Sequence, residues 1–147
     1  MSTEENKALA RRFAEDIINR GNVDMVDEIY APEYVAHNPN MPEDAHGPEG
    51  VKETYNMILG AFPDSEVTIE DQVAEGDKVV TRWTVRATHQ GELMDIPPSG
   101  NRVEFMGVTI SRIEGNKIVE DWDIYDALGM MQQIGAIPDS EQQAQGS

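Results

Sequence analysis

The hydrophobic pattern of the chain changes its period once, near residue 63, and this change limits the folds available to it. Before that point apolar residues recur every three to four positions, as Leu9, Phe13 and Ile17 do on one helical face. After it, apolar and polar residues alternate, as along a β-strand. Helices that precede long, hairpin-connected strands are typical of an α+β fold. We therefore expect a cone-shaped, curved antiparallel sheet packed against three N-terminal helices.

Local signals set the limits of these helices. Ser2 and Glu5 have the spacing of a capping box at the start of the first helix. The second, short helix should end before Pro32, and the third should run from Pro48 to Pro63. In the second half, a strand begins near residue 67, and further strands are predicted over 79–88, 103–113 and 117–125, with a short closing helix over 129–135.

The charge and composition of the chain limit the classes of partner that it is expected to bind. It carries 11 Lys plus Arg against 28 Asp plus Glu, a formal net charge of −17. Such a surface repels polyphosphates and anionic lipids, so neither nucleic acid nor a membrane is an expected partner. An uncharged, hydrophobic small molecule fits better. With no internal repeat and no linker, residues 1–138 should form a single domain, followed by a flexible polar tail at 139–147.

The sequence lacks the residues that several kinds of chemistry require. The chain has no Cys, which excludes thiol nucleophiles and thiolate metal sites. Its three His have no partner at metal-ligand spacing, and there is no glycine-rich phosphate loop. We therefore expect neither a metal nor a cofactor. The N-terminus has no apolar signal core, so a cytoplasmic protein is the default expectation.

The stretch VEDWDIYD, residues 119–126, is the strongest candidate for a chemical site. In a strand, Asp121, Asp123 and Tyr125 share one face, and the two carboxyl-bearing residues lie about 7 Å apart. Two interpretations are open: this face is solvated, or it lines a pocket in which one carboxylate moves protons. On the neighbouring strand, both faces are mixed, with Phe105, Gly107, Thr109 and Ser111 on one of them, so periodicity does not decide which face is inside.

Residues 88–135 carry the motifs THxG, IPPSG and WD…QQxG in this order. With them, and with the opening helices, the chain resembles the SnoaL-like polyketide cyclase, or ester cyclase, family of the nuclear transport factor 2-like superfamily. The resemblance implies a cone-shaped α+β barrel that commonly dimerises through the outer sheet. It also implies closure of a ring in a polyketide methyl ester by intramolecular aldol condensation, without metal or coenzyme.

The resemblance also implies residue roles. The general acid/base of these cyclases matches Asp123, and the arginine of the related limonene-epoxide hydrolases, which binds the catalytic carboxylates, matches Arg82. Three positions depart from the relatives. Gly107 and Thr109 stand where the cyclases have a Gln and a His, and Thr84 stands where the epoxide hydrolases have a second aspartate.

From the residues and the resemblance together, we predict that Asp123 removes a proton α to a carbonyl of a small substrate. Arg82 would orient its carboxylate, and His37, on a loop over the cavity, Tyr34 or Thr109 would hydrogen-bond the developing oxyanion. The predicted substrate-binding residues are Tyr34, Thr84, Phe105, Gly107, Thr109, Asp121, Tyr125 and Met130. The alternatives are a non-catalytic binding module and an epoxide hydrolase-like or dehydratase-like enzyme in the same fold.

Overall fold

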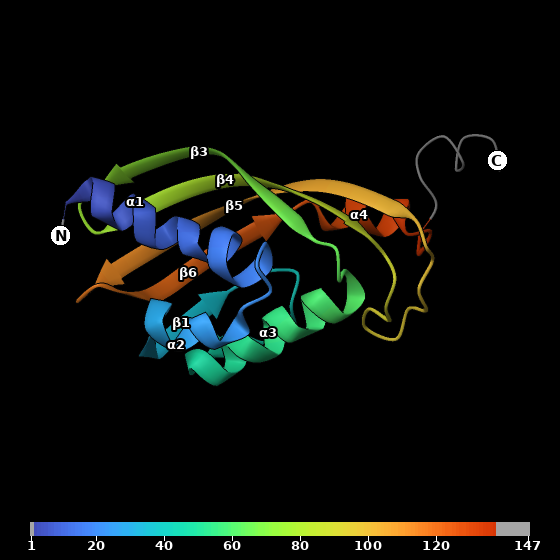
Figure 1. Cartoon of the computed structure of the whole chain (residues 1–147), viewed down its shortest axis with the longest axis horizontal. Helices are drawn as coiled ribbons and strands as arrows, with labels where there is room; N and C mark the ends of the chain where they lie inside the picture. The colour runs from blue at the N-terminus through green and yellow to red at the C-terminus, as the bar shows by residue number, and fades with distance from the viewer. Residues whose placement is uncertain (1, 138–147) are drawn as a thin grey trace.

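The computed structural model describes residues 2–137, which form a curved six-stranded sheet around helices (Figure 1). The strands lie in the order β2-β1-β6-β5-β4-β3. Their bounds are β1 Tyr30–His37, β2 Ala45–His46, β3 Glu66–Glu75, β4 Lys78–Thr88, β5 Arg102–Glu114 and β6 Lys117–Tyr125. The helices are α1 Thr3–Arg12, π-helical η1 Phe13–Ile18, 3-10 helical η2 Val23–Met25, α2 Val26–Ile29, α3 Gly47–Ala61 and α4 Ala127–Gln133.

The predicted fold class is confirmed, as is the order of helices followed by long strands. The capping box forms at Ser2 and Glu5, and α3 begins with Pro48 in its first turn. The closing helix α4 starts two residues earlier than predicted, because the Asp126 side chain accepts a hydrogen bond from the Gly129 N–H at 2.9 Å and caps it. The predicted tail lies outside the described residues.

The first helix changes type in its second half. From Phe13 to Ile18 it is a π-helix, and the Asn19 N–H donates to the Ala14 carbonyl at 2.8 Å. The Asn19 side chain then bonds both backbone groups of Val67, at 2.7 and 3.0 Å, and ties the helix end to β3. An apolar period of three to four residues does not reveal such a widened turn.

Strand β1 was not predicted. The sequence predicts a loop at His37, but Tyr30–His37 form a strand that pairs with β6, as the one parallel pair in an otherwise antiparallel sheet. The partner strand lies more than 80 residues further along the chain, so no local turn signal predicts the pairing. This pairing places the side chain of Tyr34 beside β6 and that of His37 on the opposite face.

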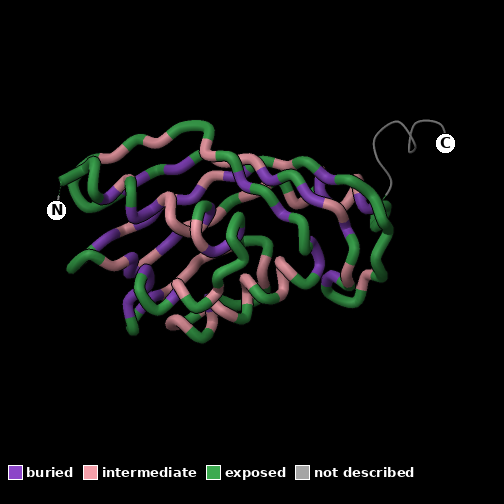
Figure 2. Tube along the Cα trace, viewed as in Figure 1, coloured by how far each residue is buried: buried purple, intermediate pink, exposed green. Residues whose placement is uncertain are grey.

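The strand register decides which face of the sheet is inside. Thr81, Thr109 and Asp123 are neighbours across β4, β5 and β6, and Ser111 lies opposite Asp121. These residues face the helices, while the residues between them face outward. Figure 2 shows the resulting alternation of buried and exposed positions along the strands. Two apolar clusters, one around Ile17, Ile29 and Ile118 and one around Phe62, Val85 and Val103, close the two ends of the interior.

Among the described residues, no helix is long and apolar enough to cross a membrane.

Candidate functional site

A cavity of about 180 Å³ lies between the concave face of the sheet and the helices. For scale, an engineered apolar cavity of about 150 Å³ binds benzene. The walls are mainly aromatic and aliphatic, and the described residues that line it include only two charged ones, Asp121 and Asp123. The aromatic lining residues are Phe13, Tyr30, Tyr34, Tyr55, Phe62, Trp83, Phe105 and Tyr125. A cavity of this kind favours an apolar ligand with few polar groups.

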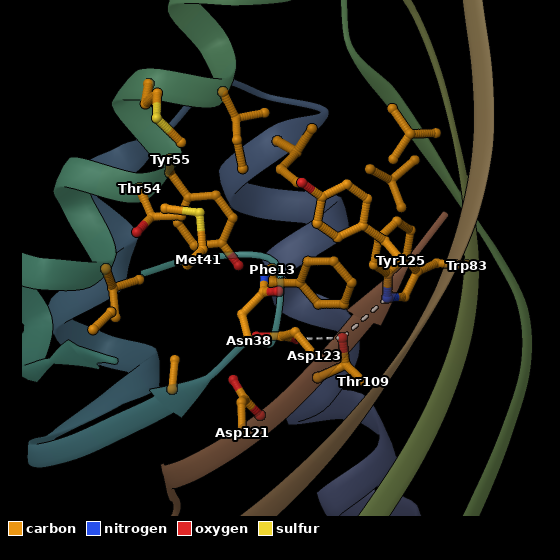
Figure 3. Close-up of a pocket in the computed structure, with 18 of the residues that line it drawn as sticks. Phe13, Asn38, Met41, Thr54, Tyr55, Trp83, Thr109, Asp121, Asp123 and Tyr125 are labelled. Carbon is orange, nitrogen blue, oxygen red and sulfur yellow. Dashed lines mark hydrogen bonds between the residues drawn. The ribbon is translucent and has the colours of Figure 1, made fainter. Parts of the chain in front are cut away.

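Asp123 projects from β6 into the cavity and is held by one side chain (Figure 3). The Thr109 hydroxyl donates to Asp123 Oδ1 at 2.7 Å, and the Trp83 indole N–H donates to the same Thr109 oxygen at 3.0 Å. Within the described residues, the second oxygen of Asp123 has no hydrogen-bond partner. Asp123 thus has one anchored oxygen and one oxygen that can meet a ligand.

Asp121 lies one pleat away on the same face of β6 and is only 4% exposed. The Tyr34 hydroxyl donates to Asp121 Oδ2 at 2.7 Å, while the buried Oδ1 has no hydrogen-bond partner in the described part of the chain. Tyr34 in turn packs edge-on against Tyr30, and the Tyr30 and Tyr55 hydroxyls lie 3.0 Å apart. The predicted sharing of one face by Asp121 and Asp123 is therefore confirmed.

Burial sets the protonation of this pair. It raises the pKa of Asp121 to about 8, with repulsion from Asp123 adding to the rise. Burial also raises the pKa of Asp123, to about 6, against the lowering effect of the Thr109 hydrogen bond. Because the two groups interact, they titrate as a pair, and near neutral pH the pair holds about one proton. A carboxylate and a carboxylic acid then stand side by side in a mainly apolar cavity.

Two residues assigned to the site by resemblance lie on the other face of the sheet. Arg82 is exposed and stands opposite Val108, so the predicted contact between Arg82 and Asp123 is wrong. Thr84 has the same parity and does not line the cavity. The sequence of β4 already indicates this outward position, because Arg82 and Thr84 alternate with Thr81, Trp83 and Val85, which face inward. The anchoring contact of Asp123 comes from Thr109 instead.

His37 also lies outside the cavity, against prediction. Its Nδ1 is 2.9 Å from Asp44 and its Nε2 is 2.7 Å from Glu120, and its ring stacks on Trp122 at 5.6 Å. These carboxylates raise the pKa of His37. The position follows from β1, in which Tyr34 faces the cavity and the side chain three residues later faces away.

The other predicted site residues line the cavity or border it. Phe105, Thr109, Tyr125 and Met130 are lining residues, as predicted. Gly107 does not line it, but its lack of a side chain makes room for Trp83, because a Cβ at position 107 would overlap the indole ring. Trp83 is a lining residue that the sequence did not identify, although an aromatic residue on the inward face of a central strand is a signal for one. Asn38, Thr54 and Tyr55 were missed as well.

The curved sheet, the covering helices and the acidic, aromatic interior define a small α+β protein that encloses a cavity. A model of the SnoaL-like polyketide cyclase family matches residues 8–134, and the chain belongs to this family. It is 30% identical to the nogalonic acid methyl ester cyclase of Streptomyces nogalater over 130 residues, 84% of this chain and 93% of that enzyme. It is also 30% identical to the aklanonic acid methyl ester cyclase DnrD of Streptomyces peucetius over 133 residues, 86% and 88% of the two chains.

Similarity in structure extends over nearly the whole chain. The crystal structure of AclR from Streptomyces galilaeus, for which a hydroxylase activity has been suggested, matches with a TM-score of 0.85 at 30% identity. The match covers 99% of this chain and 90% of AclR. Proteins that share this fold are therefore named for different reactions. The fold alone does not identify the reaction, which has to be argued from the site.

Proposed function

We propose that the protein is a cyclase that closes a ring within a neutral, hydrophobic methyl ester, with Asp123 as general acid and base. The observation that carries the proposal is the state of Asp123, which is half-buried, anchored through one oxygen and open to the cavity through the other. The two cyclases named above act, by their names, on methyl esters. Since Asp123 has a pKa raised toward neutrality, it is suited to accept and return a proton at physiological pH.

The reaction is an isomerisation. Asp123 takes a proton from the carbon α to the ester carbonyl, and the electron pair stays on the substrate as an enolate. That carbon then attacks a ketone carbon of the same molecule, a C–C bond forms, and the ketone oxygen becomes an alkoxide. The alkoxide receives the proton back from Asp123, so substrate and product have the same mass. Holding both ends of the molecule in one apolar cavity supplies the proximity that ring closure needs.

The charge of the cavity supports a neutral substrate. None of the described residues that line it is Lys, Arg or His, so a free carboxylate would meet only Asp121 and Asp123. Burying an anion beside them, without a cation to pair it, is unfavourable. Methyl esterification removes that charge.

The test uses an aromatic methyl ester with a CH₂ next to the ester carbonyl and a side-chain ketone placed to close a six-membered ring, here called the keto ester probe. Mass spectrometry and NMR of the incubated mixture should reveal an isomer of unchanged mass. Gain or loss of one water without a new ring would instead favour a hydrolase or dehydratase. Recovery of the probe unchanged but tightly bound would favour a binding module.

We also propose that two copies pair through the outer face of the sheet. Apolar side chains are exposed there, with Ile124 62% and Met106 46% exposed, and Val80 lies on the same face. Light scattering should give twice the 16.4 kDa of one chain. Ile124→Lys should halve that mass, while Asp123→Asn, inside the cavity, should leave it unchanged. A wild-type mass of one chain would rule out the dimer.

A further inference from the structure

The hydrogen bonds around Asp123 decide which of its oxygens can take a proton. The indole N–H of Trp83 can only donate, and it donates to Thr109 Oγ1 at 3.0 Å. The Thr109 hydroxyl has a single proton, and it points to Asp123 Oδ1 at 2.7 Å. The direction of this chain is therefore unambiguous, from Trp83 through Thr109 to Asp123. Oδ1 is an acceptor, and Oδ2 is left for the substrate.

We infer that Trp83 and Thr109 are positioning residues for the proton transfer, and that they keep Asp123 ionised with Oδ2 directed at the substrate. The inference rests on the proposed function, since it assigns these residues a part in the same step. The substrate proton passes from the α-carbon to Oδ2 and later from Oδ2 to the alkoxide. Oδ1 keeps its bond to Thr109 throughout, so the carboxyl group does not rotate between the two transfers.

The energetic reason lies in the burial of Asp123. A carboxylate in an apolar cavity favours its neutral form, which could not act as a base. A hydrogen bond to an ionised acceptor is stronger than one to a neutral acceptor, and donation from Trp83 polarises the Thr109 hydroxyl further. The Thr109 contact accordingly lowers the pKa of Asp123 against the effect of burial. In this chain a neutral donor pair does what the predicted Arg82 contact would have done.

The indole is held in place from three sides. Phe13 and Phe105 meet Trp83 edge-on, with ring centroids 6.4 and 6.5 Å away. Gly107 lies directly opposite Trp83 in the β4–β5 register, and a Cβ there would overlap ring atoms Cη2 and Cζ2. Any side chain at 107 and the indole in this position exclude each other. The glycine is therefore a condition for the hydrogen bond to Thr109.

The experiment compares Thr109→Val, Thr109→Ser and Trp83→Phe with wild type. One readout is the pH profile of deuterium uptake at the α-carbon of the keto ester probe, and the other is a ¹³C NMR titration of the Asp123 carboxyl group without substrate. In Thr109→Val the acidic limb and the Asp123 titration should both move up by about one pH unit, a tenfold loss of rate on that limb. Trp83→Phe should move them in the same direction by less. Thr109→Ser, which keeps the hydroxyl, should stay near wild type, as should the exposed control Thr68→Val.

Two results would overturn the inference. Equal losses in Thr109→Val and Thr109→Ser with an unmoved pH profile would mean that position 109 matters only for packing. An Asp123 titration that is the same in all variants would mean that the hydrogen bonds do not control its protonation. The NMR titration needs no turnover, so it tests whether Thr109 and Trp83 keep Asp123 ionised even where wild type exchanges no probe. In that case the proposed function fails by itself.

Discussion

Trp83 and Gly107 stand directly opposite each other on β4 and β5, and the indole of Trp83 fills the space that a side chain at Gly107 would occupy. The two positions are therefore coupled, and the side chain at one limits the size of the side chain that the other can hold. The coupling links sheet packing to the hydrogen bond that anchors Asp123.

Gly107→Ala should destabilise the protein by about 1–3 kcal/mol, the usual cost of an overpacked core. The clash involves the far ring atoms of the indole, which Phe lacks, so the same substitution should cost less in a Trp83→Phe background. The added Cβ would also lie 2.9 Å from the Ile124 carbonyl oxygen, so part of the destabilisation should remain in the Trp83→Phe background. Urea unfolding of the four proteins of this double-mutant cycle measures the coupling. Additive effects would show that the ring does not respond to position 107.

Asp121→Asn should become more stable relative to wild type as the pH rises. An unfolded aspartic acid loses its proton near pH 3.9, whereas burial holds the pKa of Asp121 at about 8 in the folded protein. Between these values the folded state binds the extra proton, so wild-type stability falls with increasing pH, by up to about 1.4 kcal/mol per unit. Asparagine does not titrate and escapes this loss. Unfolding curves at pH 5, 6, 7 and 8 test the trend, and a difference that does not change with pH would contradict it.

Ligand charge should control binding to the cavity. The keto ester probe and its uncharged amide should bind with similar affinity, whereas the free acid should bind at least about tenfold more weakly, because no cation lines the cavity to pair it. Calorimetric titration of the three ligands into Asp123→Asn, which cannot turn them over by the proposed route, measures this directly. Equal affinity for acid and ester would show that the lack of a cation in the lining does not exclude an anionic ligand.

His37→Gln should leave the turnover of the probe within about twofold of wild type, as expected for a surface substitution away from the chemistry. The imidazole lies between Asp44 and Glu120 on the outer face, and these carboxylates raise its pKa. A raised pKa means that the stabilisation is present at low pH and is lost as the pH rises through the folded value. The stability difference between wild type and variant should therefore be larger at pH 5.5 than at pH 9. A large loss of turnover would contradict this and show that His37 takes part in the reaction.

The sequence was most informative where one local pattern was enough. The change of period located the helices and the hairpin strands, and alternation placed Asp121, Asp123 and Tyr125 on one face. It was least informative where two distant segments meet. Strand β1 pairs with β6, far along the chain, and this parallel pairing turns His37 outward.

Arg82 shows a different kind of error. The alternation of Trp83 and Val85 with Arg82 and Arg86 already indicated a polar outer face, but the resemblance to the epoxide hydrolases outweighed it. Trp83 was missed because its role depends on Gly107 and Thr109, both on the neighbouring strand. Sequence spacing along a single strand carries no information on such contacts.

The most direct test of the account is the initial rate of deuterium uptake at the α-carbon of the keto ester probe in Asp123→Asn. Asparagine keeps the shape of the side chain and removes the base, so the rate should fall at least about 100-fold, within the range of general acid–base catalysis. Glu120→Gln, a carboxyl change on the same strand that faces outward, should retain the wild-type rate. A fall of less than about tenfold in Asp123→Asn would contradict the central role of Asp123.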